Sequence, residues 1–131
     1  PITLSDCITS ISLPNNKLKK IPEPILTLSG LRSLDVRENK IKVIPDLSSL
    51  WLSLRILIAD HNKICKIDEK IGKCIKLRVL RLSHNDLHEI PSTIAFLVHL
   101  KLLTLDHNYF QGLPLTIAIG FKPKSSCFIS I

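Results

Sequence analysis

The sequence predicts an α/β fold: a repeat solenoid with a curved parallel sheet on its concave face and short helical turns on its convex face. The main observation is the stretch LRVLRLSHNDLHEIP at residues 77–91, which has related copies starting at residues 8, 31, 54 and 100. The five copies follow one another at a period of 23 residues without an insertion. A second observation is an asparagine at the same place in every copy. A fixed period of this length indicates repeats that stack on their neighbours to bury a continuous core.

The copies share the pattern L-x-x-L-x-L-x-x-N-x-L, and the chain resembles the leucine-rich-repeat family over nearly its whole length. The resemblance implies one short strand in each repeat, which we expect at residues 33–36, 56–59, 79–82 and 102–105, paired in parallel. The repeat length and the Ile-Pro pair that ends most repeats resemble the intracellular class that includes Ras-pathway scaffolds and plant Ras-group proteins. Such a resemblance specifies a fold far better than a function.

The recurring asparagine is expected where the chain turns away from the sheet. Backbone groups inside such a turn cannot join the strand ladder and still need partners. An amide side chain both donates and accepts hydrogen bonds, so a column of amides can supply those partners from one repeat to the next. We therefore predict a structural role for Asn16, Asn39, Asn62, Asn85 and Asn108.

The return leg of each repeat predicts the convex side. Apolar residues at three- and four-residue spacing in EKIGKCIKL (residues 69–77) and STIAFLVHL (residues 92–100) indicate one or two helical turns. We expect Trp51 to fill the core, because it stands where other repeats have Leu28, Cys74 and Leu97.

Residues 1–131 are predicted to form one leucine-rich-repeat domain with ragged ends. Ile2 and Leu4 fit the core positions of a preceding repeat, and an irregular strand at residues 126–131 comes about three residues late. Neither end has a polar cap, so we expect further chain or another subunit to cover them. A chain that starts at Pro1 and contains no methionine is also expected to be part of a longer protein.

The cysteines and the apolar runs bear on location. The four cysteines form no C-x-x-C pair and match no zinc signature, which favours a reducing, cytoplasmic location, with a cytoskeletal or ciliary one as a variant. No apolar run approaches the roughly 20 residues that a membrane helix needs, so we expect no membrane insertion.

The four isolated glycines form no phosphate-binding loop, and no nucleophile elbow is present. We predict no enzymatic activity and no cofactor.

The predicted concave face carries the candidate binding residues. Strand alternation turns a group of apolar side chains outward, namely Ile56, Ile58, Val79 and Leu102. The charged residues around them are Arg32, Arg55, Arg78, Arg81 and Asp60. An apolar centre with a charged rim is typical of a protein-binding patch, although β-branched residues also favour strands for their own sake.

Two columns of charged or titratable residues extend this face. Arg32, Arg55 and Arg78 form a basic column that, with a net charge of +7, suits either an acidic partner or a solvated edge. His61, His84 and His107 form the second column and are also candidate partner-binding residues. We expect no carboxylate to complete a metal site there, and therefore no metal.

We predict a non-catalytic scaffold or adaptor that binds a protein partner through the concave face, and the basic column would suit a partner with an acidic surface. Two alternatives stay open. One is a structural subunit of a cytoskeletal, axonemal or ribonucleoprotein assembly, and the other is the recognition domain of a larger signalling enzyme. The sequence favours a protein partner over nucleic acid, because the columns lack aromatic residues on which bases could stack.

Overall fold

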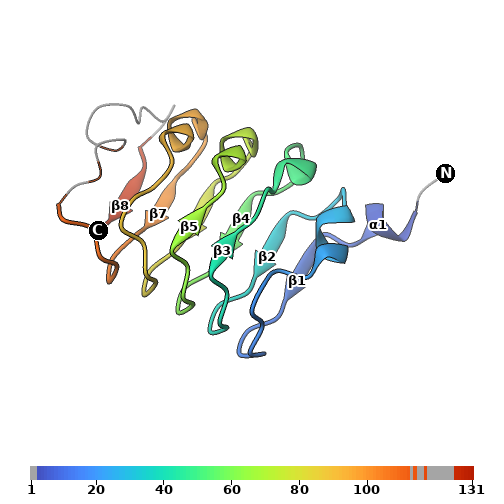
Figure 1. Ribbon diagram of the computed structural model, residues 1–131. Helices are drawn as coiled ribbons and strands as arrows, with labels where there is room; N and C mark the ends of the chain where they lie inside the picture. The colour runs from blue at the N-terminus through green and yellow to red at the C-terminus, as the bar shows by residue number, and fades with distance from the viewer. Residues whose placement is uncertain (1–2, 113, 115–116, 118–125) are drawn as a thin grey trace.

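A parallel sheet of six strands runs along the molecule (Figure 1). The structure is a computed structural model that describes residues 3–112, 114, 117 and 126–131. The strands lie in the order β1 (Ser10–Ser12), β2 (Ser33–Asp35), β4 (Ile56–Ile58), β6 (Val79–Arg81), β7 (Leu102–Thr104) and β8 (Phe128–Ser130). Residues one repeat apart are partners, as in the pairs Ile56↔Val79 and Val79↔Leu102. The parallel sheet with helical turns opposite confirms the predicted fold class.

The central strands end one residue earlier than predicted. The residue after each strand is still held by the neighbouring repeat, because the Val36 N–H donates to the Ile58 carbonyl at 2.9 Å and the Ala59 N–H to the Arg81 carbonyl at 2.8 Å. The chain then turns, so these hydrogen bonds close the ladder.

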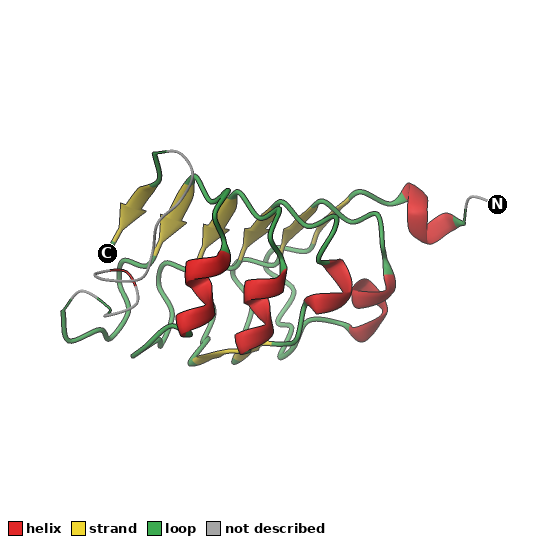
Figure 2. Cartoon of the chain, turned by 90° about the horizontal axis from the view of Figure 1, so that it is seen from above, coloured by secondary structure: helices red, strands yellow, loops and turns green. Residues whose placement is uncertain are grey.

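Short 3-10 helices form the opposite side of the molecule (Figure 2). They are η1 (Glu23–Thr27), η2 (Ser48–Leu50), η3 (Glu69–Lys73) and η4 (Ser92–Phe96). Pro22 and Pro91 precede η1 and η4 with φ of −57° and −65°, and Asp68 caps η3 by accepting a hydrogen bond from the Lys70 N–H. Proline fixes φ near the helical value, which explains where these turns start.

A second, smaller sheet lies on the return leg and was not predicted. It consists of β3 (Val43–Ile44) and β5 (Lys66–Ile67), paired in parallel. The core fills the space between this leg, the helical turns and the main sheet. The inward residues of the central strands are fully buried: Leu34, Leu57, Leu80 and Leu103.

Two core predictions were wrong. Trp51 is 45% exposed, because Ser48 stands where other helical turns have Ile25, Ile71 or Ile94, and the buried Leu50 takes the inward position instead. Leu4 is 76% exposed and begins a separate helix, α1 (Leu4–Cys7). Ile2 lies outside the described residues.

The irregular C-terminal strand forms at β8, within the predicted range. Leu102 pairs with Phe128 and Leu103 with Ile129, which is three residues later than the repeat period would put them. Among the described residues, no helix has the length and apolar character needed to cross a membrane.

Candidate protein-binding face

The asparagines set the turns that follow the strands. Asn85 is buried; its Oδ1 accepts from the Ile64 N–H at 3.0 Å, and its Nδ2 donates to the Ala59 and Leu82 carbonyls at 3.1 and 3.0 Å. Asn39, Asn62 and Asn108 repeat this arrangement. Asn16 differs, because it is exposed and its side chain only donates to the Pro14 carbonyl. The turns therefore hold the strand ends at a constant spacing.

The outer surface of the six-stranded sheet, which we call the sheet face, carries an apolar column. Ile56, Val79 and Leu102 are partners in register and their side chains are half-buried. Phe128 continues the column beside Leu102 and is 67% exposed. Sequence reasoning missed Phe128 because the extra residues before β8 break the repeat period. Four apolar side chains thus lie in a row across β4, β6, β7 and β8.

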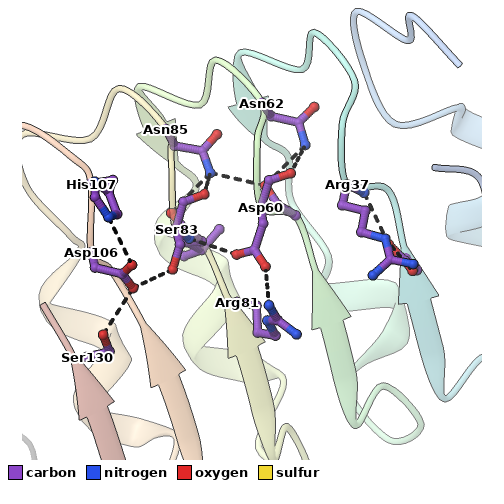
Figure 3. Close-up of polar contacts among 12 residues, drawn as sticks. Arg37, Asp60, Asn62, Arg81, Ser83, Asn85, Asp106, His107 and Ser130 are labelled. Atoms are coloured by element: carbon purple, nitrogen blue, oxygen red, sulfur yellow. Dashed lines mark hydrogen bonds and ion pairs between the residues drawn. The ribbon is translucent and has the colours of Figure 1, made fainter. Parts of the chain in front are cut away.

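A second outward column of the sheet face contains both apolar and charged side chains. Asp60, which we predicted on its charged rim, lies elsewhere. Half-buried Ile58 lies beside Arg81, which forms an ion pair with Asp60 at 2.8 Å (Figure 3). Asp60 is only 4% exposed, and its other oxygen accepts from the Ser83 N–H. Asp60 is therefore an interior partner of Arg81 and not a rim charge.

The basic column lies before the strands and keeps its charge. Arg32 and Arg78 are exposed and Arg55 is half-buried, and none of them forms a salt bridge with a described residue. A basic pocket of about 220 Å³ lies here, lined by Arg55, Lys76, Arg78 and His99. The pocket concentrates positive charge at one edge of the sheet face.

The histidine column lies at the opposite edge, in the turns. The rings of His61 and His84 stack at 4.2 Å between centroids, and those of His84 and His107 at 4.1 Å. All three residues are exposed and have φ near +55°. Histidine adopts this left-handed conformation more readily than most residues, and the repeat pattern alone does not predict it.

A carboxylate lies beside the histidine column, where we expected none to complete a metal site. A donor atom of each of His84, His107 and Asp106 lies within 4.8 Å of the other two. Hydrogen bonds, chiefly from the Ser83 hydroxyl, lower the pKa of the Asp106 carboxyl below its usual value. Asp106 is therefore an anionic neighbour of two imidazoles.

An apolar groove on the side of the helical turns was also missed. It has a volume of about 660 Å³, and its lining includes the exposed side chains Trp51, Ile75 and Phe96. Its floor includes Gly72, where a Cβ would come within 2.6 Å of the Thr93 Cβ, so η3 and η4 pack very closely. The helical turn η2 starts later in its repeat than η1, η3 and η4 do, and the outward-facing Trp51 that follows it lines one side of the groove.

Comparisons with known proteins agree with this architecture. Residues 52–110 match the family model for the leucine-rich repeat. A leucine-rich-repeat protein of Leptospira interrogans has a similar structure, with a TM-score of 0.83 and 30% sequence identity over 92% of this chain. This chain covers only 30% of the length of that protein. No curated protein gives a significant match.

Leucine-rich-repeat domains generally mediate protein–protein interaction and are typically non-enzymatic. Their extended sheet faces are suited to large partners rather than to small substrates. The architecture and the comparisons together show that this chain has the solenoid fold of leucine-rich-repeat proteins.

Proposed function

We propose that this chain is a non-catalytic scaffold or adaptor of the intracellular 23-residue repeat class, and that it binds a protein partner through the sheet face. The observation that carries the proposal is the apolar column of Ile56, Val79, Leu102 and Phe128. A half-buried row that ends in an exposed aromatic has the composition of an interface core. Ile58 widens the column toward Arg81.

The surroundings of the column support an acidic partner. Arg32, Arg55 and Arg78 lie along one edge without carboxylate partners among the described residues. The buried Nε of Arg55 also has no hydrogen-bond acceptor there. A partner with carboxylates beside its apolar contact would pair with the exposed Arg32 and Arg78, and the net charge of +7 would speed its approach.

A second candidate is a structural subunit of a cytoskeletal or ribonucleoprotein assembly, bound mainly through charge. The observation that favours it is the basic pocket of about 220 Å³. A polyanionic surface would use this pocket and leave the apolar column unused. All four cysteines are free thiols, which supports a reducing, cytoplasmic location for either candidate.

The test compares matched substitutions on the two faces. Ile58→Thr combined with Val79→Thr removes apolar surface from the sheet face and keeps the β-branched shape. Ile75→Thr makes the same change in the groove on the opposite side, where Ile75 is 41% exposed. Partners are captured from the source cells and identified, and the affinity of each purified partner is then measured by surface plasmon resonance.

The sheet-face variant should weaken binding by about 1 kcal/mol or more, whereas Ile75→Thr should leave it unchanged. The charge-reversal pair Arg55→Glu and Arg78→Glu should lower the association rate and its salt dependence. Loss of binding in the arginine variant alone would favour the polyanion candidate. Loss in the Ile75→Thr variant alone would move the site to the groove and refute the proposal.

A further inference from the structure

The histidine turns hold a set of donors that the proposed partner face does not use. His84, His107 and Asp106 each offer one ligand atom, and these atoms lie within 4.8 Å of one another. Zn²⁺ takes nitrogen and carboxylate-oxygen ligands at about 2.0–2.2 Å in a tetrahedral arrangement. From these residues we propose a binding site for a divalent transition-metal ion such as Zn²⁺, with two imidazoles and one carboxylate as protein ligands.

The orientation of Asp106 supports the site. Its Oδ1 accepts hydrogen bonds from the hydroxyls of Ser83 at 2.6 Å and Ser130 at 3.1 Å (Figure 3). These bonds leave Oδ2 facing the His107 Nε2, 3.8 Å away. Hydrogen-bonded ligands of this kind are held in place before the ion arrives, which strengthens metal binding.

The equivalent aspartate two turns earlier shows why these donors come together at Asp106. Asp60 lies beside Arg81, and their ion pair at 2.8 Å occupies the oxygen that Asp106 leaves free. At the matching place beside Asp106 the chain has Ser130 instead of a cation. Among the described residues, Asp106 forms an ion pair with His107 alone. His61 stacks on His84 at 4.2 Å, and the aspartate of its own turn, Asp60, is already paired with Arg81.

The backbone limits the rearrangement that an ion would require. His84 and His107 have φ of +57° and +56°, and the His84 N–H donates to the Asp106 carbonyl of the next repeat at 3.0 Å. Their exposed rings can still turn about the side-chain torsions. Donor atoms within 4.8 Å need to approach to about 3.3 Å for tetrahedral zinc, which is a change of rotamer and not of fold. Three protein ligands leave one position for water or for a donor of the partner.

The substitutions that test the site are chosen to spare the backbone. Asn15 occupies the equivalent place in the first repeat with φ of 56°, so asparagine fits this conformation. His107→Asn and His84→Asn each remove a ligand, and Asp106→Asn removes the charge while its carbonyl can still accept from the two serines. His61→Asn is the matched control, since it makes the same change one turn away.

Zinc chloride is titrated into the intact chain by isothermal titration calorimetry, after iodoacetamide has blocked the exposed thiols of Cys7 and Cys65. Imidazole ¹⁵N resonances are followed in parallel by NMR. We expect saturable one-to-one binding that shifts the resonances of His84 and His107 and not that of His99. Each of the three site variants should lower the affinity at least about tenfold. Circular dichroism checks that every variant is folded.

His61→Asn removes the ring that stacks on His84 but no ligand atom, so it should cost much less affinity than His107→Asn. Three results would overturn the site: binding weaker than about 1 mM, an unchanged affinity in Asp106→Asn, or an equal loss in His61→Asn and His107→Asn. The last result would assign any binding to the stacked rings alone, without the carboxylate.

Discussion

Replacing Asn85 with alanine tests how the repeats are held together. The side chain is 4% exposed and links its own repeat to the preceding one, so no water is expected to replace it. Its Nδ2 donates to the carbonyls of Ala59, Leu82 and Ser83, and its Oδ1 accepts from the Ile64 N–H. Asn85→Ala removes all of these bonds at once.

The groups left behind set the size of the effect. The Ala59 carbonyl still accepts from Asn62, and the Leu82 carbonyl still accepts from Asn108. The Ser83 carbonyl keeps the His61 N–H at 3.0 Å. Only the Ile64 N–H loses its single partner. One buried donor without an acceptor costs about 1–3 kcal/mol, and the small cavity adds to this, so we expect a loss of stability above about 1 kcal/mol.

Urea unfolding followed by circular dichroism measures the loss, with Asn16→Ala as the matched control. Asn16 is exposed and makes one hydrogen bond to a local carbonyl, so its replacement should cost less than about 0.5 kcal/mol. Equal stability of Asn85→Ala and the parent would refute the argument, as would equal losses in the two variants.

Three further predictions concern single residues. Burial raises the pKa of the Cys74 thiol to about 11, so Ellman's reagent should modify the exposed Cys65 quickly and Cys74 only on unfolding; rapid reaction at Cys74 would contradict its burial. Gly72→Ala should cost about 1–3 kcal/mol in urea unfolding, because the new Cβ would lie 2.7 Å from the Thr93 carbonyl oxygen; an unchanged midpoint would show that η3 and η4 are less closely packed. The lowered pKa of Asp106 stabilises the fold above the pKa of the unfolded chain, and this stabilisation is lost as the pH falls through the folded pKa. As the pH falls below about 4, the Asp106→Asn variant should therefore lose less unfolding free energy than the parent chain. The same pH dependence of stability in both proteins would contradict this.

The repeat fold could be predicted because its signals are local and recur. Each strand alternates, each turn has its asparagine, and the period places both without knowledge of the structure. Trp51 shows the limit of counting by period. Ser48 provides no apolar anchor for the helical turn, so Leu50 packs inward and Trp51 moves to the surface. A choice between two nearby apolar residues depends on packing, which a repeat alignment does not contain.

The candidate sites depended on pairs that lie in different repeats. Asp60 and Asp106 occupy the same position, yet one is paired with Arg81 and the other faces His107. Their environments differ because the next repeat supplies an arginine in one case and Ser130 in the other. Phe128 was missed for a related reason, since its place beside Leu102 follows from a register that the period does not give.

The central claim is that partners bind the sheet face, and methyl NMR of the isotope-labelled chain tests it most directly. Once a partner is purified, cross-saturation from that partner reports which methyl groups lie in the interface. The account predicts signal loss at Ile56, Ile58, Val79 and Leu102, and none at Ile75 in the groove on the opposite side. Signal loss at Ile75 with the four sheet-face residues unaffected would contradict it.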